Sequence, residues 1–314
     1  MRTKTLEQKD KRFHESFFKQ ILNSILVGIL IGLSYLPFGI LFGISDIFYV
    51  LLRYIVKYRN KVIIENLSFA FPEKTKLEIK LIRNKFYYHL CDVFVENIKI
   101  YSLNSNAAKR RIKIKGADEM NAYFDKGTSV IMLGMHYNNW EWSSFLPSEL
   151  KHKNLVIYNP SRGNHAFEKF LLHSREKWGS TFVPVHKSTR TVLEFNKKEI
   201  PTALGLGADQ AAPATSKFWT MFLNREAPFF SGPEKIAKRT NQPIFFHHTR
   251  KIKRGHYEIE LFPLIENPKD IESKDILLIY IRKMEEIINE KPEFYLWSHR
   301  RWKHTRPEGI PLTL

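Results

Sequence analysis

The sequence predicts an α/β fold with a mainly parallel central sheet flanked by helices. Three observations lead to this prediction. From residue 130 onward, short apolar runs alternate with segments of helical periodicity. Chemically active side chains follow two of those runs, at the strand ends where parallel sheets place their ligands. An uncharged apolar stretch near the amino terminus predicts a membrane segment ahead of the sheet.

Residues 20–45 contain no charged side chain and are long enough to cross ~30 Å of hydrocarbon. Pro37 leaves two arrangements open: one kinked membrane helix, or a helical hairpin of two shorter apolar helices. A buried core helix is the remaining alternative. Basic residues lie on both sides of the stretch, so its orientation does not follow from their distribution. We expect residues 1–60 to form an N-terminal membrane anchor.

Residues 61–314 are expected to form the α/β domain, with residues 61–115 as a helical lead-in. The helical periodicity places Leu77, Phe86 and Val93 near one face, and we interpret the interleaved charges as a solvated face.

The periodicity of the domain gives the order of its elements. Ser231, Pro233 and Glu234 predict a helix start with a capping box. The expected strands are 130–135, 155–158, 181–185, 202–206, 244–248 and 257–262, and the expected helices are 140–150, 166–178, 191–196 and 234–239.

The 314 residues include 43% hydrophobic side chains, which excludes a disordered polymer. With 50 Lys and Arg against 32 Asp and Glu, the net charge of +18 favours a polyanionic partner: nucleic acid, an anionic membrane, a phosphorylated substrate or an acidic carrier protein. Cys91 is the only cysteine, so an intrachain disulfide and a cysteine-based zinc cluster are excluded. Adjacent His247 and His248 would point to opposite faces of a strand, and we expect neither a metal nor a cofactor.

The most informative stretch runs from His136 to Glu141, directly after the first strand of the domain. An Asn between them can cap the following helix. If His136 precedes the helix and Glu141 lies in its first turns, the carboxylate can reach one imidazole nitrogen and fix the tautomer. The other nitrogen could then take a proton from a hydroxyl. The alternative is a structural histidine at a strand end.

Asp209 and Gln210 follow another expected strand, and parallel strands would bring them to the same edge as His136. The alternative is an aspartate that caps a turn. Arg175, on an expected helix, could bind a phosphate or pair with Asp209; otherwise it is an ordinary exposed arginine.

The carboxy-terminal stretch 292–303 interleaves aromatic and basic residues, among them His299, Arg300 and Arg301. This composition suits the binding of anionic head groups near a membrane interface. Nucleic-acid binding is the rival interpretation, but no nucleic-acid motif accompanies the stretch.

These motifs, in this order, resemble the late acyltransferases of lipid A biosynthesis. His136 to Glu141 resembles the family's His-x4-Asp/Glu box, Ala208 to Gln210 its later acidic motif, and 292–302 its characteristic ending. An apolar amino-terminal anchor is also usual there, so the resemblance covers nearly the whole chain.

The resemblance implies a fold similar to the glycerol-phosphate acyltransferases and the transfer of an acyl chain from acyl carrier protein to a hydroxyl of a lipid A precursor. It implies catalytic roles for His136 and Glu141, with Arg175 and Asp209 as a further essential pair, and Gln210, His299, Arg300 and Arg301 as supporting candidates. His136 would act as general base for direct attack on the thioester. The expected place is the bacterial inner membrane, in contact with membrane lipid, with the catalytic domain on the cytoplasmic side and no nucleic acid involved.

Two other functions remain open. The acceptor could be another bacterial glycolipid or aminolipid, with acyl-CoA as donor. Alternatively, the chain could be a basic, membrane-anchored binding protein in which His136 and Glu141 are structural.

Overall fold

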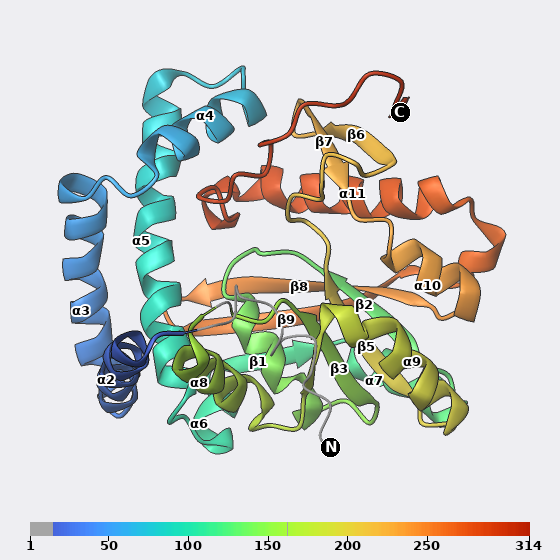
Figure 1. Ribbon diagram of the computed structural model, residues 1–314, viewed down its shortest axis with the longest axis horizontal. Helices are drawn as coiled ribbons and strands as arrows, with labels where there is room; N and C mark the ends of the chain where they lie inside the picture. The colour runs from blue at the N-terminus through green and yellow to red at the C-terminus, as the bar shows by residue number, and fades with distance from the viewer. Residues whose placement is uncertain (1–14, 162) are drawn as a thin grey trace.

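The computed structural model describes residues 15–161 and 163–314 and contains a central seven-stranded sheet of order β1-β9-β8-β2-β5-β3-β4 (Figure 1). Strands β8, β2, β5, β3 and β4 are parallel; β9 is antiparallel to β8, and β1 pairs with β9 in parallel at the edge. The predicted α/β fold with a mainly parallel sheet is confirmed. The strands are β1 (Ile112–Lys115), β2 (Val130–Gly134), β3 (Lys153–Tyr158), β4 (Thr181–Pro184), β5 (Thr202–Gly207), β8 (Ile244–Lys253) and β9 (His256–Ile265).

Both faces of the sheet are covered, because alternate residues of each strand point to opposite sides. Ile131 and Leu133 of β2 pack on one face, with helices α9 (Ser188–Lys197), α10 (Pro233–Thr240) and α11 (Ser273–Glu290). Val130 and Met132 pack on the other. That second face is covered by α6 (Ser105–Lys109), α7 (Ala117–Asp125) and the 3-10 helix η3 (Trp140–Ser148).

A small second sheet, of order β10-β6-β7, lies beside α11 (Figure 1). Its strands are β6 (Phe218–Phe222), β7 (Arg225–Phe229) and β10 (Leu312–Thr313). Neither this sheet nor α7, α11 and β1 was predicted from the sequence. Strand β1 also lies inside the expected helical lead-in, so residues 112–115 belong to the sheet.

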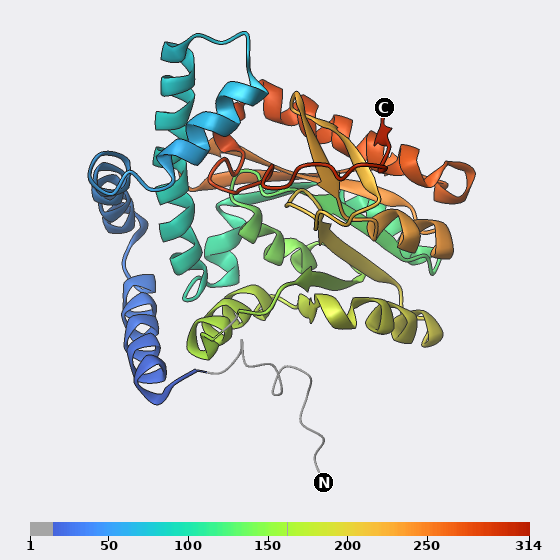
Figure 2. The ribbon, with the colours of Figure 1, turned by 45° about the horizontal axis from the view of Figure 1, so that its top comes forward.

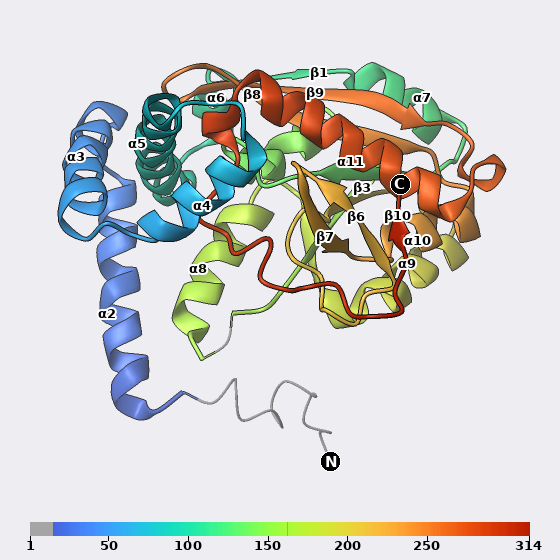
Figure 3. The same ribbon diagram turned by 90° about the horizontal axis from the view of Figure 1, so that it is seen from above.

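Two apolar helices precede the domain: α2 (Phe17–Ser34), and α3 (Phe38–Val50), which continues into a π-helical turn to Ile55. Helix α2 lies alongside α8 (His165–Glu176), and α3 lies alongside α5 (Lys76–Ile100) (Figures 2 and 3). Pro37 is the N-cap of α3, so it separates two helices and does not kink one. Residues 1–14 of the expected anchor lie outside the described part of the chain.

Each apolar helix provides an 18-residue span that could cross a membrane by length and composition. Only 11% of each span is buried, whereas a core helix would be mostly buried. The two helices therefore suggest membrane association, and the core-helix alternative does not fit them.

The helical lead-in contains α4 (Asn60–Ala70) and α5, which begins with a capping box between Thr75 and Glu78. Phe86 and Val93 are buried as expected, but Leu77 is 64% exposed. The larger error concerns the charges of α5, because Asp92 and Glu96 are 0% exposed. They are buried because α5 packs against basic and tyrosine side chains of β8 and β9.

Helix α10 begins differently from the prediction. Gly232 is its N-cap and makes no side-chain hydrogen bond there, while Pro233 occupies the first turn as expected. The predicted capping box between Ser231 and Glu234 is therefore wrong. Glu234 is buried, and burial raises the pKa of its carboxyl.

At Gly134, at the end of β2, a glycine is required because the side chain of His247 packs closely against its backbone. A Cβ there would lie 2.9 Å from Nδ1 of His247, whereas the nearest contact of a Cβ at Gly205 of β5 would be an ordinary 3.5 Å. We expect Gly134→Ala to lower the free energy of unfolding by about 1–3 kcal/mol, because His247 must shift. Gly205→Ala, the matched control, should change it by less than about 1 kcal/mol. Thermal unfolding of the purified chain in detergent measures both, and equal midpoints for the two variants would contradict the close packing of Gly134 against His247.

Candidate active site

Two neighbouring strands of the central sheet end in register and carry His136 and Asp209. Gly134 of β2 pairs with Gly207 of β5, and each site residue stands two positions beyond its glycine. The expectation that His136 and Asp209 share one edge of the sheet is confirmed.

His136 is held by both oxygens of the Asp209 carboxylate. Nδ1 of His136 lies 2.7 Å from Oδ1 of Asp209, and the backbone N–H of His136 donates to Oδ2 at 3.0 Å. Since an ionised carboxylate only accepts hydrogen bonds, Nδ1 is the protonated nitrogen of the ring. Nε2 then keeps its lone pair and lies 3.1 Å from Nε2 of Gln210, whose amide donates to it.

The electrostatics of this pair follow from its burial and mutual attraction. Burial lowers the pKa of His136, but the charge and hydrogen bond of Asp209 outweigh it, so the pKa lies above its usual value. For Asp209, burial raises the pKa, and His136 together with Arg301 brings it below its usual range. Asp209 is therefore an ionised carboxylate at neutral pH, although it is only 2% exposed.

Glu141 forms a second charge pair, with Arg175 of α8. Nε of Arg175 donates to Oε2 of Glu141 at 2.7 Å, and Nη2 donates to Oε1 at 2.5 Å. This two-point geometry is the strongest arrangement between a guanidinium and a carboxylate. Burial raises the pKa of Glu141, but Arg175 outweighs burial and keeps the carboxyl below its usual range.

The predicted pairings of these four residues are therefore exchanged. His136 is hydrogen-bonded to Asp209 and not to Glu141, the partner expected from the sequence, and Arg175 binds Glu141, whereas a phosphate or Asp209 was expected. The carboxylate of Asp209 reaches the imidazole because β2 and β5 are adjacent and in register. The segment after His136 is a 3-10 helix, and Asn139 caps it by accepting a hydrogen bond from the N–H of Glu141.

Glu96 of α5 anchors the loop between His136 and Glu141. Its Oε2 accepts hydrogen bonds from Nδ2 of Asn139 and from the hydroxyl of Tyr257, each at 2.8 Å. Because Oδ1 of Asn139 caps Glu141, a continuous chain of contacts runs from Glu96 through Asn139 to Glu141. Burial raises the pKa of Glu96 to about 6, although both hydrogen bonds lower it. No residue pattern in the sequence distinguished Glu96 from the other charges of α5.

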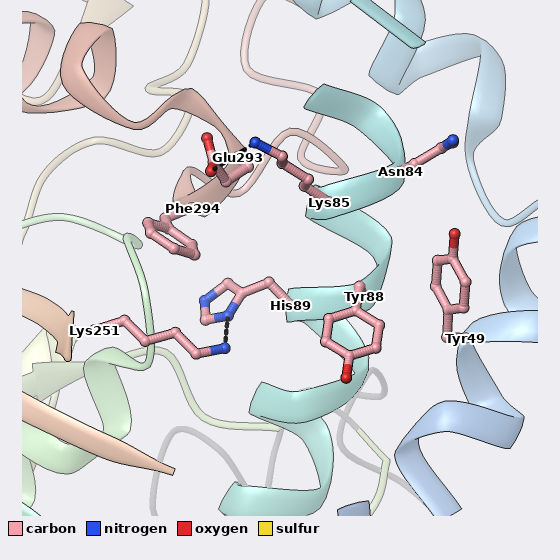
Figure 4. A pocket seen from close by; sticks show the side chains of 8 residues that line it. All are labelled: Tyr49, Asn84, Lys85, Tyr88, His89, Lys251, Glu293 and Phe294. Carbon is pink, nitrogen blue, oxygen red and sulfur yellow. Dashed lines mark hydrogen bonds and ion pairs between the residues drawn. The ribbon is translucent and has the colours of Figure 1, made fainter. Parts of the chain in front are cut away.

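A hollow of about 350 Å³ lies beside this loop, between α5, α3 and the segment around Phe294 (Figure 4). Lys251 reaches across it to His89, with Nζ 3.3 Å from Nδ1, and also pairs with Asp92 at 3.2 Å. The carbonyl of Phe294 accepts the backbone N–H of Asn138 at 2.9 Å. Phe294, which lines the hollow, therefore also holds the loop that follows His136.

The carboxy-terminal stretch is only partly as predicted. Arg300 is exposed, but Arg301 is 1% exposed, and its guanidinium lies 4.2 Å from the ring centre of Phe229. His299 accepts the backbone N–H of Ala211 through Nε2 at 3.2 Å, next to Gln210. Because the aromatic residues Tyr295, Trp297 and Trp302 are also buried, the stretch is mainly a core segment behind the site, and the surface role expected for it as a whole is wrong.

Cys91 offers no activated thiol. It is 1% exposed on α5, and burial raises its pKa to about 12, which keeps the sulfur protonated at neutral pH.

A parallel sheet whose carboxyl edge carries a histidine–aspartate pair beside a glutamate–arginine pair is suited to general-base chemistry on a hydroxyl group. Comparison with known proteins makes this specific. The sequence-family model for the bacterial lipid A biosynthesis acyltransferases matches residues 8–304 of the chain. The lipid A biosynthesis lauroyltransferase of Escherichia coli (strain K12) is 21% identical over 294 residues, which cover 91% of this chain and 92% of that protein. The chain belongs to the bacterial lipid A biosynthesis acyltransferase family and is an O-acyltransferase.

The raised pKa of Glu96 gives a testable pH dependence. Between about pH 4.5 and 6 the native state binds more protons than the unfolded state, so this carboxyl lowers stability as the pH rises, by about 2 kcal/mol in all. Glu96→Gln keeps an acceptor oxygen for Asn139 and removes the titration. We expect the free energy of unfolding of the variant, relative to that of the parent, to rise by about that amount between pH 4.5 and 7.5. Thermal unfolding in detergent at both pH values measures this, and a difference that does not change with pH would contradict it.

Proposed function

We propose that His136 is the general base of acyl transfer in lipid A biosynthesis, and that it deprotonates the acceptor hydroxyl for direct attack on the acyl thioester. The observation that carries this proposal is the 2.7 Å contact between Nδ1 of His136 and Asp209, which makes Nε2 the unprotonated nitrogen of the neutral imidazole. The protonated Cys91 supports a mechanism without an acyl-enzyme intermediate.

In this mechanism Asp209 orients the imidazole and stabilises the imidazolium that forms when Nε2 takes the proton. The amide of Gln210 occupies the lone pair of Nε2 in the structure. An acceptor hydroxyl would replace that amide and donate to the same nitrogen. Gln210 therefore holds the ring in position until the acceptor binds.

Arg175 and Glu141 support the reaction as a fixed charge pair. Glu141 uses both of its oxygens on Arg175, so we assign its carboxylate the task of holding the guanidinium in place. The remaining nitrogen of Arg175, Nη1, makes no hydrogen bond to the residues that the structure describes. It is our candidate donor to the thioester oxygen, where negative charge develops in the transition state.

Acyl carrier protein is the proposed donor, because it is acidic and the chain has a net charge of +18. We place the catalytic domain on the cytoplasmic side of the bacterial inner membrane, where that donor is soluble, with α2 and α3 in contact with the bilayer. The proposed acceptor is a phosphorylated lipid A precursor with a free hydroxyl.

The second candidate keeps the chemistry and exchanges the substrates: another bacterial glycolipid or aminolipid as acceptor, with acyl-CoA as donor. Acyl transfer measured in membranes with each donor in turn separates the two donors. Mass spectrometry of lipid A from cells with and without the gene identifies the acceptor, because a lipid A that keeps its acyl chains in the deletion strain would favour the second candidate.

We expect His136→Ala to lower the rate of acyl transfer by about 10²–10⁴, the contribution of a positioned general base. Folding should be retained, because His136 is partly exposed and lies at a strand end. The rate is measured with acyl carrier protein and acceptor in mixed micelles, and circular dichroism serves as the folding control. A variant that transfers at nearly the parental rate would rule out the mechanism.

The pH profile of kcat/KM tests the role of Asp209. The free base must be neutral, so activity should rise with pH through a His136 pKa above its usual value. In Asp209→Asn, burial becomes the dominant influence on the pKa of His136, so the rise in kcat/KM should move to lower pH. The value of kcat/KM on its high-pH plateau should fall by about 10²-fold or more.

Glu141→Gln is the matched control for that profile. The charge of Glu141 also raises the pKa of His136, but by less than the charge of Asp209 does. The rise in kcat/KM should therefore move less in Glu141→Gln than in Asp209→Asn. Equal shifts in the two variants would show that Asp209 is not the specific partner of the imidazole.

A further inference from the structure

A second cavity, of about 650 Å³, lies at the junction of the two apolar helices with the catalytic domain. Its walls come from the start of α3, the carboxyl end of α5, α6 and the segments around Arg111 and His256. In Figure 1 this region lies at the lower left, where α2, α5 and α6 approach one another. None of the lining residues takes part in the charge pairs around His136.

The cavity is lined by cations. Lys99, Arg110 and Arg111 face it, and none of its lining residues within the described ranges carries a carboxylate. Burial and the neighbouring Arg111 lower the pKa of Lys99, which shows that these positive charges repel one another. The cluster is a place where an anion would relieve that repulsion.

Two of the cations are fixed in position. Nζ of Lys99 donates to the carbonyls of Ser34 and Leu36, at 2.8 and 3.0 Å, at the carboxyl end of α2. The guanidinium of Arg111 lies 3.4 Å from the ring centre of Phe38 and donates one hydrogen bond, to the carbonyl of Gly255. The other guanidinium N–H groups of Arg111 make no hydrogen bond to the residues that the structure describes.

Arg110 differs from these two. It is exposed, and its side chain forms no ion pair or hydrogen bond with residues 15–161 or 163–314. A ligand could recruit its planar, five-donor guanidinium without breaking an existing contact.

The position of the cavity indicates where the ligand comes from. Phe38 and Pro37 form part of its wall and lie where two helices meet whose apolar side chains face outward, among them Ile29 at 55% and Ile40 at 52% exposure. A lipid whose tails lie along these helices would bring its head group to this junction.

We propose that this cavity binds the phosphate group of a membrane lipid through Lys99, Arg110 and Arg111. The site goes beyond the proposed function, because it is separate from His136 and its occupancy does not require acyl transfer. It would fix the position of the catalytic domain relative to the lipid surface from which the acceptor is taken.

Binding of dioleoyl phosphatidic acid to the full chain in a non-ionic detergent, followed by native mass spectrometry, tests the proposal. Dioleoylglycerol has the same tails without the phosphate and measures tail binding alone. We expect phosphatidic acid to bind the parent at least about tenfold more tightly than dioleoylglycerol, as hydrogen bonds to charged groups allow. Arg110→Gln should weaken phosphatidic acid binding by about tenfold, and Arg110→Gln with Lys99→Gln should weaken it further.

The matched control is Lys109→Gln with Lys113→Gln, which removes two exposed cations from the neighbouring α6 and β1. It should bind as the parent does. Arg110→Gln on its own keeps the test valid if loss of Lys99 disturbs α2, because the side chain of Arg110 has no ion pair or hydrogen bond to lose within the described ranges.

Three results would overturn the proposal. The first is equal binding by the parent, the Arg110 variants and the control. The second is inorganic phosphate binding as tightly as phosphatidic acid, which would identify a soluble phosphate as the ligand. The third is binding of acyl carrier protein that depends on Arg110 while phosphatidic acid does not bind, which would make the cavity a protein contact.

Discussion

The active site depends on the register between β2 and β5. Because Gly134 pairs with Gly207, β2 and β5 end at the same level of the sheet. His136 and Asp209, each two residues beyond its glycine, are therefore in contact. A shift of one residue would turn every side chain of one strand to the opposite face. The Asp209 carboxylate, buried and ionised, then accepts both the ring N–H and the backbone N–H of His136, which fixes the tautomer that a general base needs.

Further charged residues surround the contact between His136 and Asp209. Glu141 and Arg175 form a second pair, and Glu96 holds the connecting loop through Asn139. Arg301 lies behind Asp209, in contact with aromatic rings, and its positive field helps to keep Asp209 ionised. The guanidinium nitrogens of Arg301 are buried without a hydrogen-bond partner among the described residues, so this charge costs stability while it lowers the pKa of Asp209. Proposed lipid-phosphate binding at the junction of α2 and α3 would place this assembly at the surface of the bilayer.

The sequence was sufficient to predict six of the seven strands of the central sheet and the shared edge of His136 and Asp209, because periodicity and parallel pairing are local and regular signals. It could not predict which carboxylate meets which cation, since the answer depends on where α8 presents Arg175. The burial of Asp92 and Glu96 was hidden for the same reason: Lys251 and Tyr257, their partners, lie about half the chain away. Arg301 looked like a surface residue because its cover, the β6–β7 hairpin, was not recognised in the sequence.

A double-mutant cycle between His136 and Asp209 tests the central claim most directly. The quantity measured is kcat/KM for acyl transfer by the parent, His136→Ala, Asp209→Asn and the double variant, each checked for folding. If Asp209 acts through the imidazole, its replacement should cost almost nothing once His136 is gone, so the double variant should be about as active as His136→Ala alone. If the two losses multiply, Asp209 acts independently of His136, and a mechanism in which the carboxylate works through the imidazole is contradicted.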